Sequence, residues 1–237
     1  MISEYTFHTT DGAIFSQFFG PRRLGPQDLL GGGPVEVDTP HTTPLVGNGS
    51  LGMRLLTASQ AGHCYRTDSH QHGWTSGGLQ SQFYVAAVNS FTGGYGFGFY
   101  CYAQAEDLTA GGAAYLAGCS NSLLSSDGYT FDVFLSRVVN GLPDYLTTAR
   151  LLTRVRDSQW PLTTHFRLGL DWRLMAGGLM LTVSTSLALA GDLTPLFQYT
   201  DVSPLTMPQH EGIWIANGAS TIFKAFADET VFRNDSL

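Results

Sequence analysis

One stretch of the sequence decides the fold. Residues 166–174 read Phe-Arg-Leu-Gly-Leu-Asp-Trp-Arg-Leu, so large apolar side chains alternate with Arg, Gly and Asp. Successive side chains of a β-strand point to opposite faces, and the stretch therefore predicts a strand with one wet face and one buried face that contains Trp172. The small-residue corner Ala176-Gly177-Gly178 leads into a second alternating run over 179–186. Together the two runs predict a β-hairpin.

Short apolar runs separated by turn residues continue along the whole chain. Further strands are expected over 14–19, 51–57, 62–66, 82–89, 96–104, 129–139, 147–153, 196–200, 212–216 and 222–226. The 28 glycines and 10 prolines suit many turns, and only short segments such as 146–155 are readable as either helix or strand. Many short strands with frequent turns predict an all-β fold, an antiparallel β-sandwich of jelly-roll type. We expect one domain over residues 1–237, with its first strand pairing near the end of the chain.

One long segment departs from this pattern. Residues 20–45 are rich in Pro and Gly and include Gly31-Gly32-Gly33. Irregular segments of this length in a compact domain are usually functional. The sequence therefore predicts an irregular arm at about 20–45 that contacts neighbouring subunits. The alternative is a linker that joins a small N-terminal piece to the main domain.

Charge and cysteine usage exclude several classes of protein. The net charge of −7 disfavours nucleic acid as a partner. No basic-then-apolar leader and no apolar run of about 20 residues is present, so neither a signal peptide nor a membrane span is expected. Cys64, Cys101 and Cys119 are widely spaced and contain no C-x-x-C pair, which is typical of buried free thiols made in a reducing cytoplasm.

A glycine-rich motif at 47–52 matches G-x-G-x-x-G, which in dinucleotide-binding proteins joins a strand to a helix. Here the residues that follow, 53–57, look extended, and strands do not alternate with helices downstream. The motif is better interpreted as a glycine turn that enters a strand.

Histidines gather in one polar segment, where His70 and His72 flank a single residue and His63 precedes them. A metal site would need a third ligand, for which Cys64 and Asp68 are the local candidates. Because the segment reads as a loop, solvated histidines are the simpler interpretation.

Catalytic signatures are missing from the sequence. The five glutamates form no E-x-D-x-E strand pattern, which would place three carboxylates on one face. Ser50 lacks the first glycine of a G-x-S-x-G nucleophile elbow, because Asn48 occupies that position. The sequence therefore predicts a protein that is not an enzyme.

The four tryptophans divide into two pairs. Alternation places Trp172 in the core, and Trp214 is expected there as well. Trp74 and Trp160 lie in loop-like sequence beside glycines and Pro161, and they are the better candidates for contact with a ligand.

The order of these features resembles the concanavalin A-like lectin/glucanase (laminin-G-like) jelly-roll family. The resemblance covers residue 46 to the end of the chain and rests on the segments 48–55, 94–99, 128–134, 172–174, 199–205 and 211–215. It implies a scaffold that often binds glycans or proteins. The catalytic carboxylate strand of the family's glucanases is missing, and no Asp and Asn cluster matches the calcium site of its lectins. We therefore expect no cofactor. Asp201 is a candidate calcium ligand, but its simpler role is to hold the loop before Pro204.

The sequence leads to one main hypothesis of function and two alternatives. The leading hypothesis is a structural virion protein of a tailed bacteriophage, a capsid decoration or tail or fibre-associated subunit, made in the host cytoplasm. Its partners would be other virion subunits in a homo-oligomer or multi-copy assembly, with a surface glycan as a further partner. The alternative is a lectin-like carbohydrate-binding module with a shallow site formed by Trp74, Trp160, His70, His72 and Asp201. The second alternative is a glycoside hydrolase with an unrecognised site.

Overall fold

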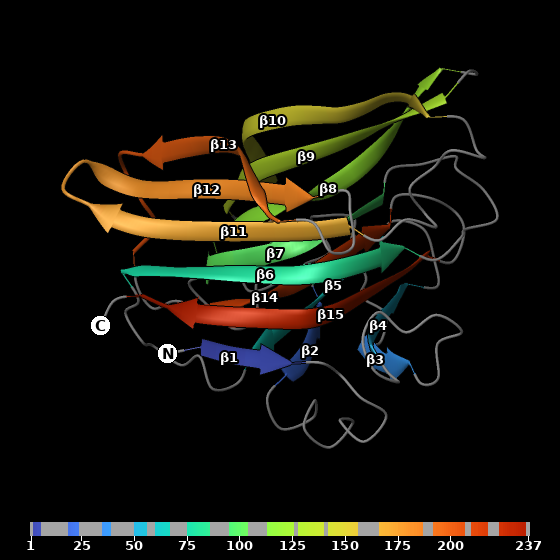
Figure 1. Cartoon of the computed structure of the whole chain (residues 1–237), viewed down its shortest axis with the longest axis horizontal. Coiled ribbons are helices and arrows are strands. Elements are labelled where there is room, and N and C mark those ends of the chain that lie inside the picture. The colour runs from blue at the N-terminus through green and yellow to red at the C-terminus, as the bar shows by residue number, and fades with distance from the viewer. Residues whose placement is uncertain are drawn as a thin grey trace.

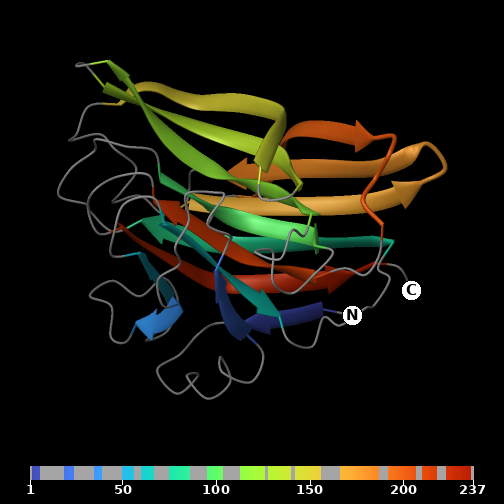
Figure 2. The ribbon, with the colours of Figure 1, turned by 180° about the vertical axis from the view of Figure 1, so that it is seen from behind.

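The protein forms two antiparallel β-sheets that lie face to face as a sandwich (Figure 1; Figure 2 shows it from behind). The computed structural model describes residues 2–5, 19–23, 35–38, 50–55, 60–66, 75–85, 95–103, 113–125, 128–139, 142–155, 166–186, 192–206, 210–217 and 223–235. Within this part, every strand pair is antiparallel. None of the described residues forms a helix long and apolar enough to cross a membrane.

The first sheet has eight strands, in the order β13-β12-β11-β6-β15-β4-β3, and β1 pairs with β15 off this path. Their bounds are β1 Ile2–Tyr5, β3 Val35–Asp38, β4 Ser50–Leu55, β6 Ser76–Val85, β11 Phe166–Met175, β12 Gly178–Ser186, β13 Thr194–Asp201 and β15 Phe223–Asn234. The described strand nearest the start of the chain, Ile2–Tyr5, pairs with the last strand, as expected of the first strand. Of the predicted strand 14–19, only Phe19 is described, and it belongs to β2 (Phe19–Arg23), which pairs with β5 (Gln60–Arg66).

The second sheet has seven strands, in the order β10-β9-β8-β7-β14-β5-β2. Their bounds are β2 Phe19–Arg23, β5 Gln60–Arg66, β7 Tyr95–Ala103, β8 Ala113–Ser125, β9 Gly128–Val139, β10 Leu142–Val155 and β14 His210–Asn217. β10 settles the ambiguous segment 146–155 as strand.

The predicted hairpin is β11 and β12, which pair directly across the turn at 176–177. Leu168 and Leu170 are 0% exposed and Trp172 is 2% exposed, so this part of the apolar face of β11 lies in the core as predicted. Leu174, which the alternation places on the same face, is 42% exposed because it lies at the end of the strand, next to the turn. Phe83 of β6 contacts two rings of the other sheet, with centroid distances of 5.1 Å to Phe97 and 5.4 Å to Phe99. The core therefore lies between the two sheets, where apolar burial stabilises the fold.

Two adjacent glycines of β6, Gly77 and Gly78, leave space for other side chains on both faces of the strand. A Cβ on Gly77 would collide with the indole of Trp172, its partner across the β11–β6 pair. A Cβ on Gly78 would collide with the Asp171 carboxylate and approach the Arg233 guanidinium. The missing side chains thus make room for the Trp172 ring inside the sandwich and for an ion pair on its outer face.

Trp214 of β14 is accommodated in the same way by the second sheet. Cβ atoms on Gly96 or Gly118 would collide with its ring, which packs at 5.7 Å from the Phe134 ring. Its Nε1 donates a hydrogen bond to the Phe99 carbonyl at 3.0 Å. Trp214 is 4% exposed, which confirms that it is buried.

The segment expected to be an irregular arm contains two strands instead. β2 pairs with β5 and β3 pairs with β4, so parts of residues 20–45 extend the two sheets at their edges. β2 holds Pro21, and an edge strand tolerates proline because one side of its backbone has no ladder to complete. The remaining residues of the arm lie outside the described part of the chain.

Several strands begin earlier than expected or were not expected at all. β6 starts at Ser76, ahead of the predicted 82–89, and β10 starts at Leu142, ahead of the predicted 147–153. β1, β3 and β8 have no counterpart among the predicted strands. Strand β4 begins at Ser50, in agreement with a glycine turn that enters a strand.

Cys101 and Cys119 are free and fully buried, as the sequence predicted. Burial raises the pKa of both thiols, and the nearby Glu211 carboxylate raises that of Cys101 further. Buried thiols with raised pKa values are poor nucleophiles. The side chain of Cys64 lies outside the described residues.

Candidate functional site

One end of the sandwich collects strand ends from both sheets, and we call it the Asp201 end. Asp201 closes β13 and pairs with Leu179, which in turn pairs with Leu174 of β11. The Leu174 amide donates a hydrogen bond to the Thr75 carbonyl at 2.6 Å. The turn at 176–177 projects beyond the neighbouring strands at this end (Figure 1). The end is thus defined by Thr75, the β11–β12 turn and the residues that follow Asp201.

His70, His72 and Trp74 lie outside the described residues, but both ends of their connection are described. The connection leaves β5 after Arg66 and enters β6 after Thr75. Arg66 follows Tyr65, which lies across β14 from Tyr100, because both pair with Gly212. Tyr100 is next to Cys101, whose partner Tyr115 is hydrogen-bonded to Asp201. Arg66 therefore belongs to the Asp201 end, and so does Thr75, which is bonded to Leu174. The connection that carries His70, His72 and Trp74 therefore starts and finishes at this end.

Trp160 also lies outside the described residues, and its flanking strand ends lie at the other end of the sandwich. The preceding strand finishes at Val155, which pairs with Tyr129, and the following one starts at Phe166, which pairs with Phe83. Both flanks are a full strand length away from Asp201. The described strands therefore place Asp201 at the same end as Arg66 and Thr75, which flank the connection of Trp74, and at the opposite end from the flanks of Trp160.

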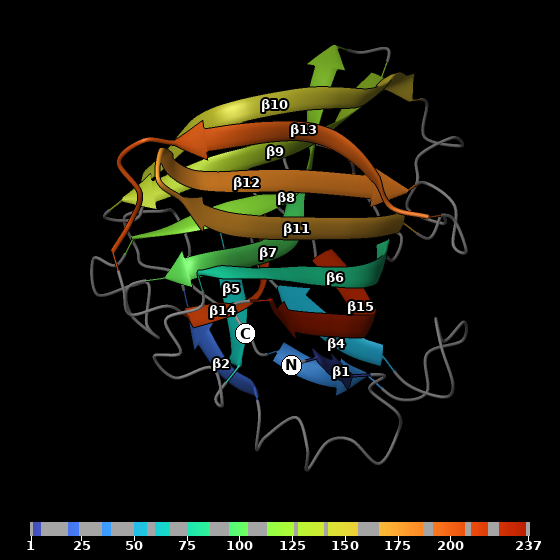
Figure 3. The same ribbon diagram turned by 60° about the vertical axis from the view of Figure 1, so that its left-hand side comes forward.

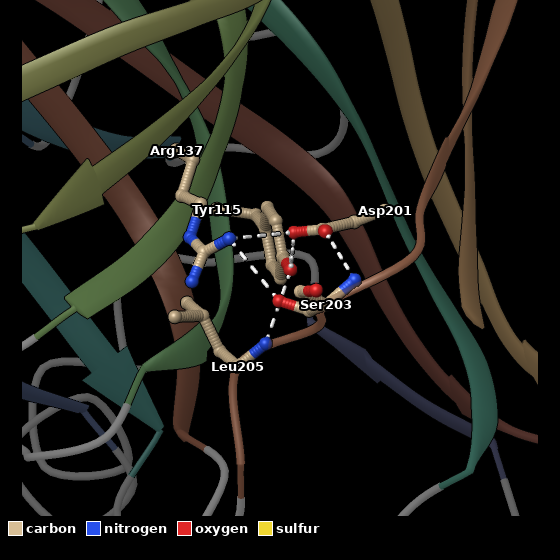
Figure 4. A network of polar contacts seen from close by, with 5 residues as sticks. All are labelled: Tyr115, Arg137, Asp201, Ser203 and Leu205. Atoms are coloured by element: carbon tan, nitrogen blue, oxygen red, sulfur yellow. Dashed lines mark hydrogen bonds and ion pairs between the residues drawn. The ribbon is translucent and has the colours of Figure 1, made fainter.

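Asp201 is 6% exposed, and protein donors engage both of its carboxylate oxygens (Figure 4). Its Oδ2 accepts hydrogen bonds from the Tyr115 hydroxyl at 2.5 Å and from Arg137 Nη1 at 3.0 Å. Its Oδ1 accepts a hydrogen bond from the Ser203 amide at 2.8 Å. The expectation that Asp201 holds the loop before Pro204 is confirmed. Its predicted role as a ligand for a sugar or calcium stays a prediction.

The same network fixes the backbone that follows Asp201. Arg137 Nη1 also donates to the Ser203 carbonyl at 3.1 Å, and the Leu205 amide donates to the Tyr115 hydroxyl at 3.2 Å. Tyr115 and Arg137 belong to β8 and β9 of the second sheet, whereas Asp201 ends β13 of the first. The network therefore joins the two sheets at the Asp201 end and orders the segment 203–205.

Burial is the main reason why the pKa of Tyr115 is raised well above its usual value, and the hydrogen bond to Asp201 raises it further. A phenol that donates to a buried carboxylate stays neutral, since its ionised form would face the Asp201 charge. The network is therefore a phenol, a carboxylate and a guanidinium in a fixed arrangement, with no proton poised to leave at neutral pH.

Sequence reasoning did not find Tyr115 and Arg137. They lie 86 and 64 residues from Asp201 along the chain, in strands with no local signal of a polar site. Only the pairing of β8 with β9 and the closure of the sandwich bring them to Asp201.

A second charged cluster lies on the outer face of the first sheet. Arg233 donates to Asp171 and to Asp235, each at 2.6 Å, across the gap left by Gly78. Burial raises the pKa of Asp171, although Arg233 lowers it in part. The side chains of Asp171 and Arg233 are 43% and 40% exposed, and exposed ion pairs contribute at most about 1 kcal/mol. The cluster is a surface feature with its charges paired.

Metal-binding groups do not gather in the part of the chain that the structure describes, where no three His, Cys, Asp or Glu side chains are close enough to hold an ion. His70 and His72 lie outside that part, and of His63 only the backbone, in β5, is described.

Comparison of the fold with solved structures places it among lectins and related sandwiches. The lectin UEA-II, solved with galactose, has a TM-score of 0.62 at 11% identity, with 98% of each chain covered. The legume lectin-like domain of Entamoeba histolytica has a TM-score of 0.55 at 10% identity, covering 95% of this chain and 94% of that one. A GH16 protein of Bacteroides ovatus, solved with a glucan product, has a TM-score of 0.56 at 10% identity, with 98% of each chain covered.

No protein-family model and no curated protein matches the sequence. At such identities the likeness concerns the fold, which is a concanavalin A-like jelly roll, as the sequence predicted.

Proposed function

We propose that this chain is a carbohydrate-binding domain without catalytic activity, and that its glycan site lies at the Asp201 end. One observation supports the proposal: Arg66 and Thr75, the described residues that flank the connection with His70, His72 and Trp74, lie at the same end of the sandwich as the ordered segment after Asp201. The similarity to sandwiches solved with sugars, such as the UEA-II lectin with galactose, supports the same function.

The physical requirements of a sugar site fit this end. A sugar ring has apolar C–H faces and a rim of hydroxyl groups, so it needs an apolar surface with a few fixed polar groups around it. An indole such as that of Trp74 supplies apolar area, and imidazoles such as those of His70 and His72 supply hydrogen-bonding groups. The backbone of the segment 203–205 is already held by hydrogen bonds, so it would lose little conformational entropy when a sugar binds.

The chemistry of Asp201 argues against hydrolysis at this end. A glycosidase needs one carboxyl group to protonate the leaving group and a second to act as nucleophile or base. Both oxygens of Asp201 accept hydrogen bonds from protein donors, so this carboxylate is committed to structure. This supports binding over catalysis, even though the fold is similar to that of a GH16 protein.

The carbohydrate-binding hypothesis has more support than the virion hypothesis, because the similar structures reported above are lectins and a GH16 protein. The virion location and its partners stay predictions from sequence.

The proposal is tested on a printed array of galactosides, N-acetylgalactosaminides and mixed-linkage glucans, probed with calcium and with a chelator. We expect saturable binding to one glycan class and at least a tenfold loss of affinity for Trp74→Ala. A comparison of the two conditions also tests the predicted independence from a cofactor. Absence of binding to every probe contradicts the function. Loss on Trp160→Ala with retention on Trp74→Ala contradicts the position of the site.

A further inference from the structure

Strand β7 contains a β-bulge near its end. Along β14, the register of the pairing with β7 shifts between His210 and Gly212. As a result, Cys101 and Tyr102 of β7 together oppose the single residue Glu211. Two residues opposite one define a bulge, and bulges are more frequent next to functional sites, where they turn a side chain in a new direction.

The backbone of Tyr102 is strained. Its φ is 54°, and no other side-chain-bearing residue in the described part of the chain has a positive φ. The left-handed region costs free energy for any residue with a Cβ, and a bulky aromatic residue is rarely found there. Such a conformation persists only where the surrounding structure enforces it, and residues of this kind concentrate at functional sites. The strain therefore indicates a specific task for the Tyr102 side chain.

The bulge turns the Tyr102 ring toward the interior of the sandwich. Phe97 and Phe99 contact Phe83 of the first sheet, so regular alternation would place residue 102 on the opposite face of β7. Instead, the Tyr102 ring lies edge-on to the buried Trp172 ring, with their centroids 6.4 Å apart. Tyr102 is accordingly 3% exposed. Its place in the core thus depends on the bulge.

The same ring contacts the network at Asp201. The rings of Tyr102 and Tyr115 are edge-on to each other, with their centroids 6.1 Å apart. The Tyr115 hydroxyl donates a hydrogen bond to Asp201 and accepts one from the Leu205 amide. Hydrogen bonds weaken steeply when their geometry is lost, so both depend on the position of the Tyr115 ring. Tyr102 therefore connects the buried Trp172 ring to the backbone after Asp201.

We propose that Tyr102 is a positioning residue: its strained backbone aims the ring at Tyr115, and Tyr115 holds the segment 203–205 in the shape that the glycan site requires. The effect on affinity rests on the proposed function, whereas the effect on the segment 203–205 does not. The sequence did not indicate this role, because Tyr102 is one of several aromatic residues in the predicted strand 96–104.

The role is tested by hydrogen exchange of Tyr102→Leu, which removes the ring, with Tyr102→Phe, which retains it, as the matched control. We expect exchange at the Leu205 amide to become at least tenfold faster in Tyr102→Leu and to change less than twofold in Tyr102→Phe. Exchange at Leu170, in a strand paired on both sides, reports global unfolding. Faster exchange at Leu170 without a change at Leu205 shows a merely structural role and overturns the inference.

Tyr102→Met takes the place of Tyr102→Leu if the latter does not fold, since the flexible methionine side chain fills irregular space in a core. The same expectations apply to it. Unchanged exchange at Leu205 in a folded variant without the ring overturns the inference.

A double substitution tests whether Tyr102 acts through Tyr115. Tyr115→Phe removes the hydroxyl that binds Asp201 and the Leu205 amide, so it should itself speed exchange at Leu205. In that background, Tyr102→Leu should add less than a twofold change, because the hydrogen bonds that it supports are already lost. Effects of the two substitutions that simply multiply overturn the coupling.

The effect on the glycan site is measured by calorimetry with the array probe that the unchanged protein binds most tightly. We expect about a threefold to tenfold loss of affinity for Tyr102→Leu and less than a twofold change for Tyr102→Phe. Faster exchange at Leu205 with unchanged affinity overturns the role of Tyr102 in the glycan site while the proposed function stands. If the unchanged protein binds no probe, the proposed function fails, and exchange at Leu205 still decides whether Tyr102 positions the segment.

Discussion

At the scale of single residues, the packing of this protein depends on tryptophans that lie against glycines. The Trp172 ring occupies the space beside Gly77, and the Trp214 ring occupies the space beside Gly96 and Gly118. Glycine weakens a strand in isolation, because it adds backbone freedom to the unfolded chain and offers no side chain to pack. The large apolar area of a buried indole offsets this cost.

Gly77→Ala is expected to lower the free energy of unfolding by about 1–3 kcal/mol, because the new methyl group overpacks against Trp172 and the Arg233 carbonyl. Gly177→Ala is the matched control, since a Cβ there meets nothing within 4 Å, and it should change stability by less than about 0.5 kcal/mol. Urea denaturation measures both. Equal stabilities of the two variants would contradict the packing described for Trp172.

Tyr115→Phe is expected to change the alkaline stability of the protein. The folded pKa of Tyr115 lies above the unfolded value of 10.0, so the contribution of its neutral form is complete below pH 10. Above pH 10 the unfolded chain loses this proton first, and the stability falls as the pH rises. Between pH 10 and 12 the variant should therefore lose less stability than the unchanged protein in urea titrations. Equal losses of stability in the variant and the unchanged protein would contradict this prediction, because they would show that Tyr115 has the same pKa in the folded and unfolded states.

At the scale of elements, the prolines that fall in described strands occupy edge strands. Pro21 is in β2, Pro143 in β10 and Pro195 in β13, each at the end of a sheet. Proline cannot donate a hydrogen bond to a ladder and blunts an exposed edge against pairing with another chain. β10 also carries several register shifts along β9, which twist the edge further.

Hydrogen exchange should rank the strands by their place in the first sheet. β6 and β11 are paired on both sides and bury core residues, whereas β3 has four residues and pairs with β4 alone. We expect the amides of β6 and β11 to exchange slowest and those of β3 to exchange fastest. Exchange of β11 as fast as that of β3 would contradict the strand order.

The sequence predicted those strands in which one face is apolar and the other is polar. The β11–β12 hairpin was predicted to within about a residue at either side of the turn, because its apolar and polar side chains alternate. β8 was missed because Ala, Gly, Ser and Cys dominate it and its strand conformation depends on β7 and β9 at its sides. Gly77-Gly78 reads locally as a turn, and only the distant Trp172 and Arg233 explain why it is strand.

The candidate site was predictable only in part for the same reason. Local composition marked Trp74, His70 and His72 as loop residues, and Asp201 as the residue that holds its own loop. The partners of Asp201 are products of sheet order, which no short motif encodes. The same order separates the flanks of Trp160 from the site.

At the scale of the whole molecule, the sandwich has two unlike ends. The view in Figure 3 shows the strands of the first sheet running side by side toward both ends. One end carries the Asp201 network together with Arg66 and Thr75, the residues that flank the connection of Trp74, whereas the other carries the flanks of Trp160. The described flanks of both connections belong to strands of the two layers, an arrangement in which residues at one end can change without a change in the core.

The most direct test of the account is a titration of the ¹⁵N-labelled protein with the best-bound array glycan, followed by amide chemical shifts. We predict that the largest shifts fall on Thr75, Leu174, Val202 and Ser203, while Tyr129 and Phe166 at the other end stay unchanged. Shifts centred on Tyr129 and Phe166, or a spectrum that the glycan leaves unaltered, would contradict a glycan site at the Asp201 end.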